Sequence, residues 1–177
     1  MVGVVRVADH QVPERNQKTA MQLIDGELYP ILRRLWAYTP VPEPHVAGLV
    51  IGRVLYARWP RRITQKRTMA RASGLGLIGC GVLLIGWAFR SVAGNIGPEE
   101  RQLVTTGPYA FSRNPMYVGW TMLYAGRALL SNNRWVALLL PAVVAITHVG
   151  TIQEERALER EFGDEYRVFR QNVRRYL

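Results

Sequence analysis

The sequence is poor in the residues that build disulfide-bonded and metal-binding proteins. Among its 177 residues there are one cysteine, Cys80, and three histidines. One cysteine excludes an internal disulfide framework, and the histidines lie too far apart in sequence to match the spacing of metal ligands. We therefore expect no metal site. The first 20 residues also lack the sustained apolar core of a signal peptide.

Negative charge is scarce as well, and the formal net charge is +10. Such an excess of positive charge is typical of nucleic-acid-binding proteins. However, 49% of the residues are hydrophobic, and they gather in long runs between basic segments. Runs of about 18 residues are close to the length that crosses the hydrocarbon core of a bilayer. The composition therefore predicts an integral membrane protein, in contact with membrane lipids and not with nucleic acid.

The order of these runs predicts an all-α bundle of about four transmembrane helices. The run with Arg53 near its middle is the least regular of the four. Between the last two runs, Ser131 or Asn133 is expected to cap the returning helix, and Pro141 is expected to kink that helix. Glycines in the second run would let neighbouring helices approach closely. The four runs are residues 45–60, 72–89, 116–130 and 134–152, and the glycines are Gly74, Gly76, Gly79, Gly81 and Gly86.

A polar N-terminal region precedes this bundle, and a charged tail follows it. Residues 1–44 form a polar N-terminal region with an amphipathic interfacial helix at 21–38, and residues 45–177 form the membrane domain. The tail, 153–177, is too charged to span, but its apolar residues recur every three or four positions opposite a row of arginines. This pattern predicts amphipathic helices that are attracted to anionic headgroups. Gly163 is expected to end one helix and Asp164 to cap the next.

Alternating spans place the N-terminus, residues 90–115 and the tail on one side of the membrane. That side carries 14 basic residues and the opposite side carries seven. Positive charge favours the cytosolic side, although the dense basic loop at 58–71 favours the reverse orientation. We predict a multi-pass protein of the plasma (inner) membrane, with the more basic side in the cytosol.

The stretch TTGPYAFSRNPMYVGW, residues 105–120, is unusually polar for the start of an apolar span. The following hairpin returns the chain to the same side, so Arg113 should lie near Glu154 and Glu155. Charges at such a depth must pair, reach water or bind a ligand. A structural Arg–Glu bridge explains one pair but leaves the second glutamate, Tyr109 and Tyr117 without a role. Asn114, before a proline, has the sequence of a helix N-cap.

These side chains together suit one kind of ligand. An arginine binds a carboxylate with a fork of donors. A glutamate binds an ammonium group or ribose hydroxyls, and aromatic rings cover an adenine or face a sulfonium cation. S-adenosylmethionine carries all of these groups, and we predict it as the cofactor.

The ordered elements GPY, RNPMY, EE and FGDEY, over about residues 72–177, resemble the isoprenylcysteine carboxyl methyltransferase and phospholipid methyltransferase superfamily of integral membrane enzymes. The resemblance implies a methyltransferase whose cofactor pocket is closed by the C-terminal segment. Arg113 and Glu155 would be the catalytic residues. Asn114 replaces a histidine of the eukaryotic prenylcysteine enzymes. The residues that the resemblance places at the cofactor are Leu103, Val104, Gly107, Tyr109, Arg113, Asn114, Tyr117, Glu154 and Glu155.

The first prediction for the reaction is methyl transfer from S-adenosylmethionine to a lipophilic acceptor with a carboxylate, its lipid tail entering sideways between helices. One alternative is an N-methyltransferase that acts on phosphatidylethanolamine. A second is an NADPH-dependent membrane reductase similar to the sterol reductases, although their His-Pro-Asn-Tyr element contrasts with Asn-Pro-Met-Tyr at 114–117. A third is a membrane scaffold without enzymatic activity.

Overall fold

The computed structural model describes residues 42–95 and 102–177, and within these ranges the chain is helical, with no strand. This confirms the all-α class. The interfacial helix predicted at 21–38, and most of the predicted region 1–44, lie outside the described residues. The elements are α3 (Glu43–Arg58), α4 (Arg67–Asn95), the short 3-10 turn η2 (Gly107–Ala110), α5 (Pro115–Ser131), α6 (Arg134–Phe162) and α7 (Asp164–Asn172).

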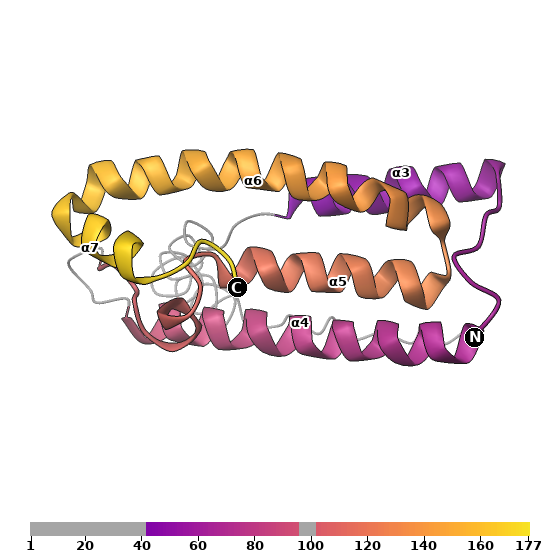
Figure 1. The fold of residues 1–177 in the computed structure, drawn as a ribbon, viewed down its shortest axis with the longest axis horizontal. Coiled ribbons are helices and arrows are strands. Elements are labelled where there is room, and N and C mark those ends of the chain that lie inside the picture. The colour runs from indigo at the N-terminus through magenta and orange to yellow at the C-terminus, as the bar shows by residue number, and fades with distance from the viewer. Residues whose placement is uncertain (1–41, 96–101) are drawn as a thin grey trace, which may run out of the picture. The chain divides into compact units, whose positions relative to one another are not determined.

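Four helices run side by side along the long axis, each antiparallel to the next in the chain (Figure 1). The most extensive contacts are those of α4 with α5, followed by those of α3 with α6. The short helix α7 folds back at the end of α6, so the last residues of the chain reach the start of α5 (Figure 1). This end of the bundle therefore brings together η2, the start of α5, the last turns of α6 and the tail.

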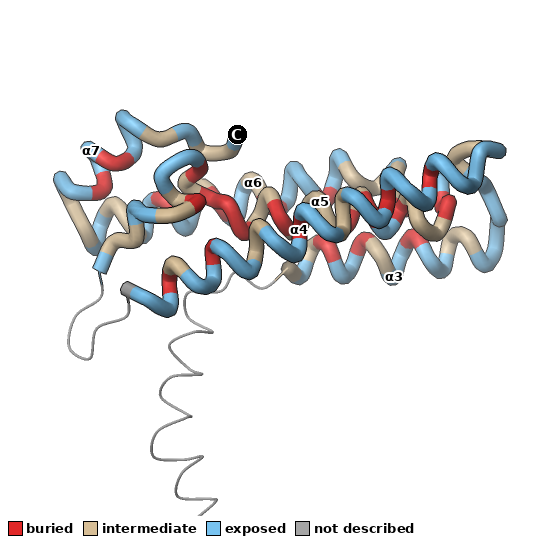
Figure 2. Tube along the Cα trace, turned by 90° about the horizontal axis from the view of Figure 1, so that it is seen from below, coloured by how far each residue is buried: buried red, intermediate tan, exposed pale blue. Residues whose placement is uncertain are grey.

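Two of the described helices, α4 and α6, are long and apolar enough to cross a membrane. Their outer faces are largely exposed (Figure 2), and they carry large apolar side chains such as Leu83, 74% exposed. A helix face of this kind is stable against lipid tails and unfavourable in water. α3 and α5 have 16 and 17 residues. They reach about 25 Å, less than the hydrocarbon thickness of about 30 Å, so the count of four spans stays a prediction.

Glycines allow the backbones of α4 and α5 to touch. A Cβ on Gly81 would lie 2.8 Å from the carbonyl oxygen of Gly119, and a Cβ on Gly74 would lie 2.8 Å from that of Gly126. In each helix the two glycines are seven residues apart, so they lie on one face. The predicted close approach is thus confirmed for Gly74 and Gly81. In the described part of the chain, a Cβ would meet nothing within 4 Å at Gly76, Gly79 or Gly86.

Two asparagines organise the turn between α5 and α6. Asn132 adopts the left-handed conformation, with φ of 49°. The side-chain oxygen of Asn133 accepts hydrogen bonds from the amides of Trp135 at 2.9 Å and Val136 at 3.3 Å. Asn133 is therefore the N-cap of α6, as one of the two predicted candidates, and Ser131 is the last residue of α5.

The tail differs from the prediction at Asp164, which is the first residue of α7 and does not cap it. α6 itself continues without interruption from the predicted span into the tail, through Pro141 and on to Phe162. The residues after 152 are charged, yet glutamate, arginine and alanine are good helix formers, so polarity alone does not stop the helix. It ends at Gly163, with φ of 54°, as expected. Asp164 starts α7 without a capping hydrogen bond and pairs with Arg167 at 2.8 Å.

Candidate functional site

The loop that enters the site packs tightly on α4. Leu103 and Val104 are half-buried in the extended segment before η2. Gly107 has φ of 63°, and a Cβ there would collide with the side chain of Ser91 on α4. Glycine is thus required both by the backbone conformation and by the close contact. The turn then directs Tyr109 and Arg113 toward the end of α6.

A buried ion pair joins this loop to α6. A guanidinium nitrogen of Arg113 lies 3.0 Å from a carboxylate oxygen of Glu155, and the two side chains are 8% and 7% exposed. Arg113 Nη1 also donates hydrogen bonds to the carbonyl oxygens of Arg170 at 3.0 Å and Val173 at 2.8 Å. Nearly all of the donors of Arg113 are therefore used within the protein.

The tail completes this cluster. Arg175 donates to both carboxylate oxygens of Glu155, the shortest contact being 2.9 Å. The side-chain amide of Asn114 donates to Glu155 and to the carbonyl oxygen of Arg175, both at 3.2 Å. Asn114 precedes α5 but makes no capping hydrogen bond with its side chain. Asn114 therefore stands at the predicted N-cap position, but its side-chain oxygen does not cap the helix, because its side-chain NH2 is directed to the buried carboxylate and to the tail.

Glu154 has a different environment from Glu155. It is exposed to solvent, and its carboxylate accepts a hydrogen bond from the hydroxyl of Tyr117 at 3.2 Å. Tyr109 is half-buried nearby, and its burial, with the negative charge of Glu154, raises the pKa of its phenol. Two neutral phenols thus lie beside a carboxylate that accepts no other hydrogen bond from the described residues.

A cavity of about 330 Å³ opens beside Tyr117, between α5, α6 and the tail. Tyr176 lies at its rim, held by a 3.0 Å hydrogen bond between its hydroxyl and His148. Thr147 is buried in its wall, and its hydroxyl has no hydrogen-bond partner among the described residues. The volume falls within the usual range for small-molecule sites, roughly 300–1,000 Å³. The lining residues are Tyr117, Val118, Thr121, Met122, Val144, Thr147, Tyr176 and Leu177.

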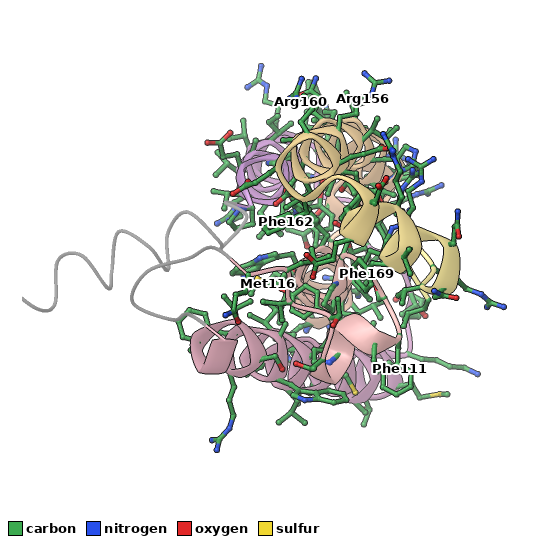
Figure 3. The ribbon with its side chains drawn as sticks, turned by 90° about the vertical axis from the view of Figure 1, so that its left-hand side faces the viewer. Phe111, Met116, Arg156, Arg160, Phe162 and Phe169 are labelled. Atoms are coloured by element: carbon green, nitrogen blue, oxygen red, sulfur yellow. The ribbon has the colours of Figure 1, made fainter. Side chains whose placement is uncertain are left out.

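α7 closes the end of the bundle with aromatic side chains. Figure 3 shows Phe162 and Phe169 on the inner side of the helices, whereas Arg156 and Arg160 point outward from α6. Tyr166 packs beside Phe169, with ring centroids 6.1 Å apart. Burial, with the nearby charge of Glu155, raises the pKa of Tyr166 to about 12. Tyr166 therefore lies close to the buried side chains of Arg113 and Glu155 in the ion cluster.

The sequence prediction brought the correct segments together but missed part of the site. Arg113, Asn114 and Glu155 lie in one cluster, and Tyr109, Tyr117 and Glu154 in a second group beside it. Leu103, Val104 and Gly107 lie in the segment that leads to them. Arg175, Thr147 and Leu177 were not predicted. Their positions depend on the return of the tail and on side-chain packing, for which the sequence carries no local signal.

Comparison with known proteins gives two matches. The model of the family described as phospholipid methyltransferase matches residues 69–165, more than half of the chain. The human protein named phosphatidylethanolamine N-methyltransferase is 30% identical over 109 residues, which cover 58% of this chain and 54% of the human protein. The chain thus spans about half the length of this curated relative. The matched region includes α5, α6 and both glutamates.

Proposed function

Since the chain belongs to the phospholipid methyltransferase family, we propose that it transfers a methyl group from S-adenosylmethionine to the amine of a phosphatidylethanolamine-type phospholipid. This is the first alternative of the sequence analysis. Family and relative favour it over the carboxylate acceptor predicted first. The observation that carries the proposal is the cavity beside Tyr117, whose hydroxyl donates to Glu154; α5 and α6, which form most of its wall, lie within the matched region.

The residues around this cavity fit the methyl donor. The rings of Tyr117 and Tyr176 offer faces for an adenine or for a sulfonium cation, and the hydroxyl of Thr147 is free to bind a polar group. Glu154 is available for an ammonium group or for ribose hydroxyls. When bound, S-adenosylmethionine supplies a methyl group on a positively charged sulfur. The apolar wall of the cavity would keep water away from that carbon.

An amine acceptor places a further demand on the site. Its nitrogen is protonated at neutral pH and must lose a proton before it can attack a methyl group. Glu155 accepts hydrogen bonds from three side chains, whereas Glu154 accepts one from Tyr117. Glu154 is therefore the better placed carboxylate to receive the proton and to attract the ammonium headgroup.

Arg113 and Glu155 would then act as positioning residues. Their direct role in catalysis stays a prediction, because their polar atoms contact each other, Asn114 and the tail. Held in this way, they fix the loop of Tyr109, the end of α6 and the tail around the cavity. We propose the plasma membrane as the location, with this more basic end of the bundle in the cytosol.

The proposal is tested with the purified protein in vesicles of phosphatidylethanolamine and methyl-labelled S-adenosylmethionine. We expect labelled N-methylated phospholipid, and loss of labelling in Glu154→Gln with the fold retained. A matched control is Glu161→Gln, about two turns beyond Glu154 on the same helix. A prenylcysteine is offered as a competing acceptor in a parallel reaction; labelling of its carboxylate in place of the lipid amine, or no labelling of any lipid, would overturn the proposal.

A further inference from the structure

A second cavity, of about 180 Å³, lies next to the first. The one hydroxyl in its wall belongs to Ser112, which donates to the carbonyl oxygen of Arg175 at 3.3 Å and accepts from the amide of Asn114 at 3.2 Å. The wall is otherwise apolar and suits a hydrocarbon ligand. It is formed by Leu84, Trp87, Pro108, Phe111, Ser112, Pro115, Val118 and Leu177.

The two cavities share part of their walls. Val118 on α5 and Leu177 in the tail line both of them. Ligands in the two cavities would therefore both contact these two side chains. The polar groups, Tyr117 with Glu154 and Tyr176 with His148, all lie on the side of the first cavity.

The second cavity is accessible from the outside of α4. Trp87 is 49% exposed and Phe111 is 68% exposed, and their rings are 6.5 Å apart. Figure 3 shows Phe111 on the loop beside α4. Because α4 is one of the two helices apolar enough to cross a membrane, a lipid beside it meets these rings without passing through water. Aromatic residues of a simple interfacial belt need no cavity behind them, whereas Trp87 and Phe111 line one.

From this geometry, and resting on the proposed function, we propose that the second cavity binds the start of an acyl chain of the phospholipid acceptor. Val118 and Leu177 then form the wall that separates the chain from the methyl donor, and Leu177 is a specificity-determining residue. This arrangement places the headgroup toward Glu154 while the chain leaves between Trp87 and Phe111 into the bilayer. The glycine face of α4, with Gly74 and Gly81, packs on α5 and leaves no room for a chain.

The test compares dihexanoyl- and dioctanoyl-phosphatidylethanolamine, dispersed in one fixed detergent, in binding to the purified full-length protein. A methylene that moves from water into an apolar site raises the affinity about fourfold. From detergent the gain per methylene is smaller than this factor, and the longer lipid binds more tightly to the unmodified protein. Leu84→Trp, which fills the cavity, should abolish this preference. Phe111→Ala, at an exposed position that does not endanger folding, should reduce it. Binding of S-adenosylhomocysteine should be unchanged in both variants.

The control is Phe89→Ala, two residues from Trp87 on the same helix and outside the cavity wall, which should keep the full preference. Leu177→Ala should make the longer lipid compete with S-adenosylhomocysteine, a competition absent in the unmodified protein. An unchanged chain-length preference in Leu84→Trp and Phe111→Ala, or an equal loss in Phe89→Ala, would overturn the acyl-chain site. Tight, chain-dependent binding without methyl transfer would contradict the proposed function alone.

Discussion

Glu155→Gln tests how the ion cluster holds the tail over the site. The substitution keeps the shape of the side chain but removes the charge that compensates Arg113, which is 8% exposed. Removing one partner of a buried ion pair costs about 3–5 kcal/mol. Arg175 contributes little to this loss, because it is 34% exposed and can reach water. Since the glutamine oxygen still accepts a hydrogen bond, we take the lower limit, about 3 kcal/mol.

This cost falls on the contact between the tail and the loop of Arg113. A free energy of about 1.4 kcal/mol corresponds to a tenfold change in an equilibrium constant. The equilibrium between the tail packed on this loop and the tail detached from it should therefore shift toward detachment by more than about 100-fold. Hydrogen exchange measured by mass spectrometry reports this opening at the amide of Arg113, which donates to the carbonyl oxygen of Arg174 at 2.8 Å. We expect exchange there to be faster by about the same factor, while amides in the middle of α5 keep their protection.

Glu159→Gln is the matched control, since it removes the same charge from the same helix. Glu159 pairs with Arg167 and Arg170, whose side chains are 60% and 52% exposed. Exposed pairs contribute about 0–1 kcal/mol, so exchange at Arg113 should change by less than about fivefold. Equal acceleration in the two variants would refute the argument that burial of the Arg113–Glu155 pair holds the tail.

Three further substitutions test other parts of the account. Gly81→Ala places a Cβ 2.8 Å from the carbonyl oxygen of a glycine on α5. It should lower the free energy of unfolding, measured in detergent, by about 1–3 kcal/mol. Gly79→Ala is the control: its Cβ meets no neighbouring atom within 4 Å, so the substitution should be neutral or stabilising by up to about 1 kcal/mol. Asn133→Ala removes the N-cap of α6 and the hydrogen bond from the Asn133 side chain to the carbonyl oxygen of Gly52. The free energy of unfolding in the same assay should fall by about 2–3 kcal/mol. A fall of less than half this size would contradict the capping role of Asn133. Tyr117→Phe keeps the ring but removes the hydroxyl that donates to Glu154. It should weaken S-adenosylhomocysteine binding by about threefold to tenfold, with the unfolding free energy changed by less than about 0.5 kcal/mol; unchanged affinity would exclude a role for this hydroxyl in the site.

The features that the sequence predicts well are those that follow from chain geometry. Two successive apolar helices of similar length form a hairpin, which returns the chain to the same depth in the membrane. Arg113 before the hairpin and Glu155 after it form an ion pair, as predicted. The helix start before Pro115, the turn at Asn133 and the helix end at Gly163 each rest on local backbone chemistry, and each lies at the expected residue. Local rules of this kind need no knowledge of the tertiary structure.

The features that the sequence does not predict depend on buried charge. Asn114 stands at the N-cap position, but its side-chain NH2 donates to a buried carboxylate and its side-chain oxygen makes no capping hydrogen bond. The resemblance implies that the C-terminal segment closes the site, but not that Arg113 donates there to the carbonyl oxygens of Arg170 and Val173. Both effects require the three-dimensional neighbours to be known. The two cavities likewise arise from packing between the tail and α5, which no periodicity in the sequence indicates.

The central claim is that the cavity beside Tyr117 binds the methyl donor, and calorimetric titration with S-adenosylhomocysteine tests it most directly. Val144 is in the cavity wall and 40% exposed, so Val144→Trp can fill the space without forcing a buried side chain to move. Leu138→Trp, on the same helix and outside the wall, is the control. We predict saturable binding to the unmodified protein and to Leu138→Trp, and at least about tenfold weaker binding, or about 1.4 kcal/mol, to Val144→Trp. Equal affinity in all three proteins, or no binding to any of them, would contradict the account.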